Sequence, residues 1–309
     1  MIVHRGYDNL KFRLPVVTPG IFDGVHRGHR FLIEMLVKYS REIYSESVVI
    51  TYHPHPRLIL ESDASKLSFL TTIEEKISLL EGTGIDHLVI IDFTRDFSRM
   101  PAGEFISKIL AGKVGTRHLI IGHDHHFGYR GEGSYEMVKE YAVSLGFSVE
   151  RVGKFHSEGK AVSSSLIREA LVKGEILTAS DLLGYSYSIT GTVVEGKKIG
   201  KKLNYPTANI KPAYEYKLVP GDGVYAVDVK IDNTVHHGML NIGRNPTINK
   251  SGGERTIEVN ILDFNKDIYG KGIEIIFRFR MRDEETFSSV EQLERQLALD
   301  EKKTRELLS

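Results

Sequence analysis

The periodicity of apolar residues changes near residue 185, and this change constrains the fold more than any other feature of the sequence. Before it, short apolar stretches alternate with helical patterns, an order typical of βαβ units around a parallel sheet. After it, short stretches of alternating apolar and polar residues are separated by Gly, Asn, Asp and Pro, which is typical of an antiparallel barrel or sandwich. We therefore expect two domains, 1–184 and 185–309, as the length of 309 residues also favours.

The expected elements follow from these two patterns. In the first domain, strands are expected at 14–18, 47–52, 87–92, 118–122 and 148–152. Helices are expected between and after them, at 29–39, 72–81, 102–111, 134–144 and 165–172. In the second domain, strands are expected at 188–194, 223–231, 236–242, 256–264 and 273–281. A final helix should begin near residue 289, with Ser288 and Glu291 at the spacing of a capping box and Val290, Leu293, Leu297 and Leu307 or Leu308 docking on the barrel.

Composition excludes several classes of function. Forty-one basic residues balance 41 acidic ones, so the net charge gives no reason to expect a nucleic acid or an anionic membrane as partner. The absence of cysteine excludes disulfides, thiolate nucleophiles and cysteine zinc sites. The N-terminus has no signal-peptide core, and no apolar run approaches the ~20 residues of a membrane span. We expect a soluble, cytoplasmic protein.

One glycine-rich segment lies between the first expected strand and the first expected helix. It reads Gly20-Ile-Phe-Asp-Gly-Val-His-Arg-Gly-His29. Ligands of open α/β sheets bind outside the carboxyl ends of strands, and helix N-termini attract phosphate. Gly24 and Gly28 let the backbone approach a ligand, while His26 and His29 can donate hydrogen bonds to charge on a reacting phosphate. The alternatives are an ordinary turn with solvated histidines, or a zinc site that needs at least one further ligand.

This segment resembles the signature of the nucleotidylyltransferase superfamily, and its longer form is similar to that of bacterial bifunctional riboflavin kinase/FAD synthetases. A second segment, Val162-Ser-Ser-Ser-Leu-Ile-Arg168, resembles the stretch that opens a late helix in these transferases. The resemblance implies catalytic roles for His26, His29 and Arg168. It implies ATP and phosphate binding by Gly20, Phe22, Asp23, Gly28, Ser163 and Ser164. An ordinary serine-capped helix is the alternative for the second segment.

Two weaker segments also match this family. Thr51-Tyr-His-Pro-His-Pro-Arg57 and Gly122-His-Asp-His-His-Phe-Gly128 each follow an expected strand. The resemblance implies flavin binding by Pro54, His55, Pro56, Asp124 and Phe127. The chain departs from the family pattern at His123, His125 and Leu166, where an acid, Phe and Arg are common. These departures affect how nucleotide and flavin are held, and residues 123–126 could instead bind a metal.

In the second domain, the run from Gly191 to Asn209 carries glycines, four lysines and a Pro-Thr-Ala-Asn end. Glycine-rich basic turns can hold phosphates, although many are solvated hairpins. The end resembles the riboflavin kinase motif whose Thr and Asn, here Thr207 and Asn209, reach magnesium and phosphates; oxygen ligands suit Mg²⁺. The implied ATP-binding residues are Gly196, Lys201, Pro206, Thr207 and Asn209. Lys201 and Asn204 stand where the family often has Arg and Gly.

Glu258 lies in an expected strand whose apolar residues are Ile257, Val259 and Ile261. Because strand residues alternate, these share one face, and Glu258 and Asn260 share the other. The resemblance places Glu258 at the catalytic carboxylate of the kinase, which accepts the proton of the riboflavin 5′-hydroxyl. It also implies flavin binding by Arg282 and Phe287. A solvated strand face and an exposed loop are the alternatives.

The sequence thus predicts an enzyme that converts riboflavin to FMN and FMN to FAD, using Mg²⁺ and ATP twice. Its expected partners are these small molecules. One alternative is a riboflavin kinase joined to an impaired adenylyltransferase domain. Others are a flavin- or nucleotide-binding sensor without turnover, and an enzyme that adenylylates another substrate such as a pantetheine phosphate.

Overall fold

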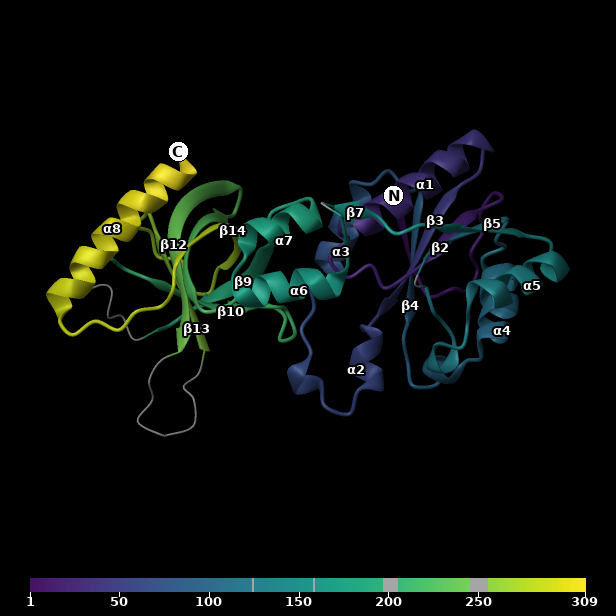
Figure 1. The fold of residues 1–309 in the computed structure, drawn as a ribbon, viewed down its shortest axis with the longest axis horizontal. Helices are drawn as coiled ribbons and strands as arrows, with labels where there is room; N and C mark the ends of the chain where they lie inside the picture. Colours follow the sequence, from purple (N-terminus) through teal and green to yellow (C-terminus); the bar gives the residue numbers. More distant parts are fainter. Residues whose placement is uncertain (124, 158, 197–204, 245–254) are drawn as a thin grey trace. The chain divides into compact units, whose positions relative to one another are not determined.

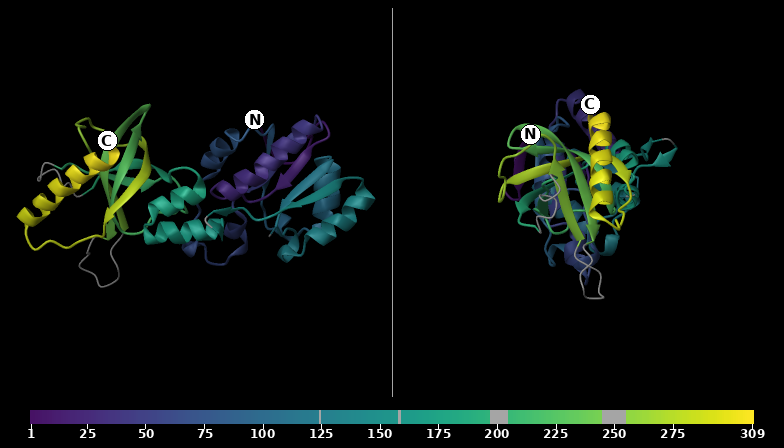
Figure 2. Two further views of the ribbon diagram at one scale, coloured as in Figure 1. Left: turned by 45° about the horizontal axis from the view of Figure 1, so that its top comes forward. Right: turned by 90° about the vertical axis from the view of Figure 1, so that its left-hand side faces the viewer.

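A computed structural model of the chain describes residues 1–123, 125–157, 159–196, 205–244 and 255–309. The chain separates into two compact units, Met1–Ser164 and Ser165–Ser309. The ribbon views show a layered α/β unit and a barrel unit (Figures 1 and 2). Among the described residues, none of the helices combines the length and hydropathy needed to span a bilayer.

The first unit is built on a parallel sheet in the order β1-β4-β3-β2-β5-β6. Its strands are β1 (Ile2–Arg5), β2 (Val16–Pro19), β3 (Ser47–His53), β4 (His87–Asp92), β5 (His118–Gly122) and β6 (Ser148–Val152). The chain steps outward from β2 to β3 and β4, and then returns to the other side of β2 as β5. The carboxyl end of β2 is therefore a topological switch point, where α/β proteins bind ligands.

Helices cover both faces of this sheet. They are α1 (Arg27–Glu42), α2 (Pro56–Leu60), α3 (Ile73–Glu81), α4 (Ala102–Glu104), the π-helical η3 (Phe105–Lys113) that continues it, and α5 (Tyr135–Leu145). Short turns η1 (Ala64–Lys66), η2 (Phe97–Arg99) and η4 (Tyr129–Gly131), and the strand pair β7 (His156–Ser157) and β8 (Lys160–Ala161), complete the unit.

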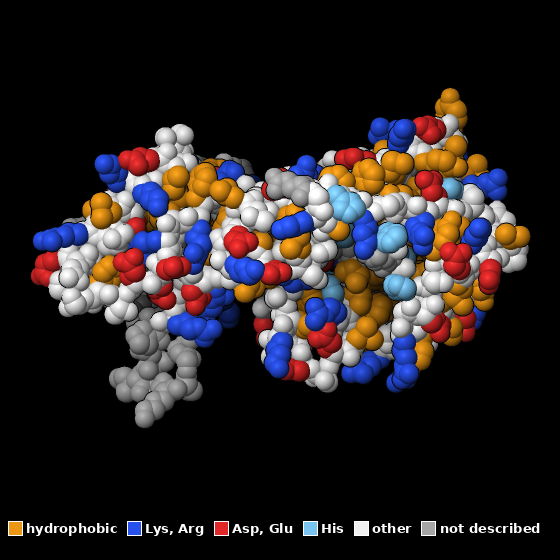
Figure 3. Space-filling model, in the orientation of Figure 1, with side chains coloured by type: hydrophobic (Ala, Val, Ile, Leu, Met, Phe, Trp, Pro, Cys, Tyr) orange, Lys and Arg blue, Asp and Glu red, His pale blue; other side chains and the backbone are white. Residues whose placement is uncertain are grey.

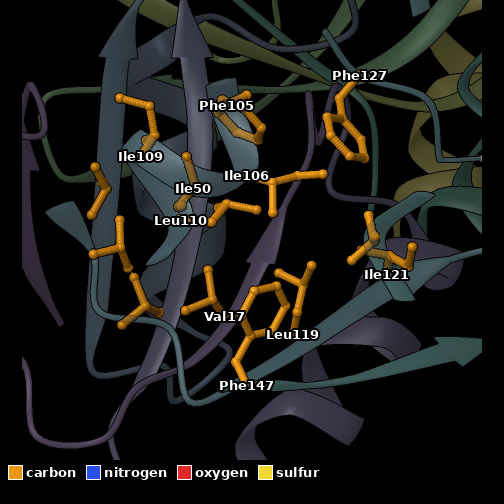
Figure 4. Close-up of a cluster of buried hydrophobic side chains, with 14 of the residues drawn as sticks. Val17, Ile50, Phe105, Ile106, Ile109, Leu110, Leu119, Ile121, Phe127 and Phe147 are labelled. Atoms are coloured by element: carbon orange, nitrogen blue, oxygen red, sulfur yellow. The ribbon is translucent and has the colours of Figure 1, made fainter. Parts of the chain in front are cut away.

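Successive strand residues face opposite layers of the core. Val16 and Ile120 belong to the cluster that contains the apolar residues of α1 and α3. Their neighbours Val17 and Leu119 join the cluster of η3 and α5 (Figure 4). This two-sided burial explains why the strands appear in the sequence as continuous apolar runs.

The second unit begins with α6 (Ser164–Lys173), whose first residue closes the first unit, and α7 (Ile176–Leu183). A closed barrel follows in the order β10-β13-β12-β11-β14-β9, with antiparallel neighbours. Its strands are β9 (Ser188–Val194), β10 (Ala208–Pro212), β11 (Gly223–Ile231), β12 (Thr234–Arg244), β13 (Arg255–Ile261) and β14 (Gly272–Arg282). The expected fold class, a parallel α/β domain followed by an antiparallel barrel and a C-terminal helix, is confirmed.

Besides the two-residue strands β7 and β8, the strands β1 and β10 were not expected from the sequence. β1 (Ile2–Arg5) is a short edge strand that includes His4 and Arg5 and pairs with β4. β10 (Ala208–Pro212) contains Asn, Lys and Pro, and it pairs with β9 and β13 to close the barrel. Both carry too few apolar residues to show a strand period, and their pairing partners determine their conformation.

The C-terminal helix α8 (Val290–Leu308) differs from expectation at its start. Ser289, not Ser288, is the N-cap, because its hydroxyl accepts the Gln292 N–H at 3.3 Å. Ser288 instead donates to the Gln292 side chain at 2.9 Å. Val290 is 57% exposed and does not dock on the barrel as expected.

The far end of α8 provides the docking contact. Leu307 and Leu308 pack against the barrel residues Val224, Ala226 and Met281. The first turn of the helix therefore lies away from the apolar contact, which explains why the sequence pattern misplaced Val290.

Candidate active sites

The loop between β2 and α1 leads into a helix that His26 caps. The Nδ1 atom of His26 accepts the His29 N–H at 3.3 Å. Because Nδ1 is an acceptor, a neutral His26 carries its proton on Nε2. The first turn of α1, all of which the structure describes, contains no acidic side chain. The partial positive charge of this N-terminus is therefore available to a phosphate.

His26 and His29 lie together, as the sequence predicted. Their rings stack with centroids 3.6 Å apart, and the edge of Phe22 lies 5.2 Å from His29. Burial, His26 and Lys76 hold the pKa of His29 well below its usual range. The ring is therefore neutral at pH 7, and its buried Nδ1 has no hydrogen-bond partner among the described residues. A neutral imidazole can donate one hydrogen bond to a phosphate oxygen.

Polar contacts fix the loop that precedes this helix. The buried Asp23 carboxylate accepts the Leu70 and Thr71 N–H groups at 3.0 and 3.1 Å. The Thr71 hydroxyl accepts the Gly24 N–H at 3.1 Å, and the Ser164 hydroxyl donates to the Asp23 carbonyl at 2.9 Å. Asp23 and Ser164, both expected at the phosphate, thus hold the loop that would receive it.

Close approach requires glycine at one position of this site and favours it at a second. A Cβ on Gly20 would lie 2.8 Å from the Phe22 ring, which is buried, and a Cβ on Gly28 would lie 3.2 Å from the His26 ring. Ser163 immediately precedes α6. Arg168 and Leu166 lie on α6 in the second unit, beyond the division of the chain.

The Pro-His-Pro segment follows β3. His55 caps α2 by accepting the Arg57 N–H at 3.2 Å, and its ring stacks on Phe69 with centroids 4.0 Å apart. Pro56 is buried and Pro54 is partly exposed. Histidines border a hydrophobic hollow on the visible face of the first unit (Figure 3).

The loop after β5 carries Asp124 and Phe127, the other expected flavin residues of the first domain. Phe127 is 8% exposed and packs in the core near Phe105, with ring centroids 5.5 Å apart (Figure 4). Burial, with a contribution from His126, lowers the pKa of His125 to about 4. Asp124 lies outside the described residues. Within the described ranges, no three His, Asp or Glu side chains gather as a metal site would require.

Residues expected at the kinase site lie where β10 pairs with β13. Asn209 is the register partner of Glu258, and the Thr207 hydroxyl donates to the Glu258 carboxylate at 3.2 Å. A Cβ on Gly196 would lie 1.9 Å from the Asn209 amide nitrogen. The barrel therefore brings together four of the residues expected at the kinase site: Gly196, Thr207, Asn209 and Glu258. Lys201 and Asn204 lie outside the described residues.

Strand alternation places Glu258 as expected. Ile257, Val259 and Ile261 are buried, whereas Glu258 is partly exposed. Asn260 is buried, and its amide donates to the Pro206 carbonyl at 2.8 Å. Asn260 thus fixes the turn that carries Thr207.

Arg282 and Phe287 lie near each other at the end of β14, with the guanidinium 5.9 Å from the ring centroid. The Arg282 guanidinium also forms a two-point ion pair with Asp300 of α8, at 3.1 and 2.7 Å. Sequence reasoning missed Asp300. The sequence gives little indication of this pair, because one acidic residue in a helix rich in charged residues does not reveal which face of the helix is buried.

These two folds and constellations define a two-domain transferase, with a parallel-sheet nucleotidyltransferase domain and an antiparallel-barrel kinase domain. A family model described as FAD synthetase matches residues 11–166, and one described as riboflavin kinase matches residues 183–308. The chain belongs to the bacterial bifunctional riboflavin kinase/FMN adenylyltransferases.

Curated relatives agree with this assignment along nearly the whole chain. Proteins named bifunctional riboflavin kinase/FMN adenylyltransferase are 36% identical in Listeria monocytogenes and 34% identical in Escherichia coli K12. These matches cover 94% of this chain and 91% and 92% of the relatives. A crystal structure described as a macrolide-efflux protein from Streptococcus pneumoniae is 32% identical, with a TM-score of 0.88 and 99% of both chains covered. That description differs from the family models and the curated relatives, which agree with each other and which we follow.

Proposed function

We propose that the barrel phosphorylates riboflavin with ATP to give FMN, and that the first domain transfers AMP from a second ATP to FMN, giving FAD and pyrophosphate. The observation that carries this proposal is the contact between Thr207 and Glu258, which places a carboxylate beside the Pro-Thr-Ala-Asn turn. We propose domain bounds of 1–184 and 185–309. A cytoplasmic location, without a nucleic-acid or membrane partner, is part of the proposal and is based on the sequence.

In the proposed kinase step, Glu258 accepts the proton of the riboflavin 5′-hydroxyl while that oxygen attacks the γ-phosphorus of ATP. The bond between the γ-phosphorus and the bridging oxygen breaks, and ADP leaves. Thr207 and Asn209 supply oxygen ligands of the kind that suit Mg²⁺. When bound, Mg²⁺ would neutralise phosphate charge. Arg282 and Phe287 are proposed to contact the flavin.

In the proposed adenylyltransferase step, a phosphate oxygen of FMN attacks the α-phosphorus of ATP, and the bond to the bridging oxygen of pyrophosphate breaks. His26 and His29 donate hydrogen bonds to the charge that develops, and the N-terminus of α1 attracts the phosphates. Arg168 is proposed as a further cation. No covalent intermediate with the protein is needed, because FMN already carries an anionic nucleophile.

The two sites can be tested separately in one protein. Purified chain is incubated with riboflavin, ATP and MgCl₂, and FMN and FAD are separated by chromatography over time. Glu258→Ala should lower FMN formation by about 10²–10⁴-fold, the range of a general base, while added FMN is still converted to FAD. His29→Ala should show the reverse pattern. Equal loss of both activities in either variant would contradict two independent sites.

The same assay separates the alternatives. Accumulation of FMN without FAD in the unsubstituted protein would identify a kinase with an impaired adenylyltransferase domain. Binding of flavin without either product would identify a sensor. The first outcome would overturn the adenylyltransferase half of the proposed function, and the second would overturn both halves.

A further inference from the structure

Lys76 is a buried cation on the apolar side of α3. Ile73, Lys76, Ile77 and Leu80 recur at the spacing of one helix face, and Lys76 is only 5% exposed. Lysine is almost never fully buried unless polar groups compensate its charge. A lysine at an apolar position of an amphipathic helix therefore requires a structural or functional reason.

The ammonium group of Lys76 binds the loop that leads to α1. Its Nζ atom donates to the Ile21 carbonyl at 2.7 Å. The Thr51 hydroxyl donates to the same carbonyl at 3.1 Å, and lies 3.5 Å from Lys76 Nζ. One backbone oxygen between Gly20 and Phe22 is thus held by two side chains from two different elements, α3 and β3.

The loop that this carbonyl belongs to has an unfavourable backbone conformation. Phe22 has a φ of 50°, Gly24 of 82° and Val25 of 35°. Positive φ is a genuine outlier for a bulky or β-branched residue, and such a conformation persists only when its surroundings determine it. Val25 directly precedes His26, so the conformation of this loop determines where the paired imidazoles point.

We propose that Lys76 is a positioning residue of the adenylyltransferase site, which holds the Ile21 carbonyl and so fixes the loop that presents His26 and His29 to the triphosphate. This inference rests on the proposed adenylyltransferase function. Thr51 assists it through the same carbonyl. Neither side chain needs to touch the nucleotide.

The charge of Lys76 also acts on the groups around it. The facing titratable groups are Asp23 in the loop, His29 on α1 and His53 at the end of β3. Burial lowers the pKa of Lys76 to about 8, and Asp23 opposes this shift. Burial is the main reason that the pKa values of His29 and His53 are lowered, and Lys76 adds to both shifts. As the pH rises through about 8, Lys76 loses its proton and the ion–carbonyl contact weakens.

The test measures FMN adenylylation by Lys76→Met, Lys76→Arg and Thr51→Val, with riboflavin phosphorylation by the same proteins as reference. Lys76→Met should lower kcat/KM for ATP about 100-fold, the effect of misplacing a reacting group by about 1 Å, and leave the kinase unchanged. The kcat/KM of the unsubstituted protein should fall above pH 8. This alkaline limb should be absent in Lys76→Met. Lys76→Arg should recover much of the rate that Lys76→Met loses, and it should also lack the alkaline limb, because arginine stays protonated.

Lys108→Met is the matched control, because Lys108 is an exposed lysine of the same unit that pairs with Glu104; it should behave like the unsubstituted protein. Thr51→Val should lower the rate less and keep the limb. If Lys76→Met does not fold, Lys76→Arg and Thr51→Val still decide the matter. Three results would overturn the inference. The first is an unchanged kcat/KM in Lys76→Met, and the second is an unchanged kcat/KM in Thr51→Val. The third is a fall of kcat/KM above pH 8 that persists in Lys76→Met or in Lys76→Arg. Failure of the unsubstituted protein to convert FMN would instead refute the proposed function itself.

Discussion

Replacement of Gly196 by alanine is expected to disable the kinase by moving a single amide group. A Cβ at this position would lie 1.9 Å from Nδ2 and 2.5 Å from Cγ of Asn209. Ordinary van der Waals contact begins at 3.4 Å, so the amide nitrogen must move by about 1.5 Å. The obstacle is the tip of a side chain, and rotation of Asn209 can relieve it.

The expected effect is therefore on catalysis and not on stability. A misplacement of about 1 Å can cost about 100-fold in rate, so the kcat of riboflavin phosphorylation should fall by roughly that factor, or about 2.7 kcal/mol of transition-state stabilisation. The urea midpoint should change little, and FMN adenylylation in the same protein should be unchanged. Both activities are measured by chromatographic separation of FMN and FAD.

A double-mutant cycle tests whether the effect travels through Asn209. If it does, Gly196→Ala should cause almost no further loss of kinase rate in an Asn209→Ala background, because the amide that it displaces is already absent. Losses that multiply would show that Gly196 acts independently of Asn209. A kinase rate within threefold of the unsubstituted protein would refute the reasoning.

Two further predictions concern buried charges. Asp300→Ala removes one partner of the two-point ion pair with Arg282; the Asp300 side chain is 5% exposed and that of Arg282 is 18% exposed. The free energy of unfolding of the second unit should therefore fall by about 3 kcal/mol. A loss below about 1 kcal/mol in a urea titration would show that the pair is solvated. Burial lowers the pKa of Lys76 from 10.5 to about 8. Between these pH values, the unfolded chain binds more protons than the folded chain. The free energy of unfolding should therefore rise with pH, by up to about 3 kcal/mol relative to Lys76→Met. A parallel pH dependence of the two proteins would contradict that pKa shift.

Much of the fold followed from the sequence because burial on both faces leaves a strong pattern. Strands such as β3 and β4 are nearly continuous apolar runs between helices, and their type and order were predicted. β10 was missed because Asn, Lys and Pro interrupt it and its conformation depends on pairing with β9 and β13. The cap of α8 was shifted by one residue, since Ser288 and Ser289 are chemically equivalent until the helix axis is fixed.

The candidate sites divide in the same way. The spacing of His26 and His29 places both within one turn of a helix start. The proximity of their rings therefore follows from the local sequence. Glu258 could be assigned to the polar face of a strand, but its contact with Thr207 joins positions 51 residues apart. That contact exists because β10 and β13 are neighbours in the closed barrel, a property that no local pattern determines.

The sequence by itself determined the two classes of fold, their order and the chemical groups available for phosphate. Only the tertiary structure decided which groups can touch a ligand and which hold the loops, because each side chain's role depends on what packs around it. Asp23 and Ser164 became supports of the loop between β2 and α1, and Lys76 became part of the same support. Periodicity reports burial along one element, whereas a site is made by elements that meet across the fold.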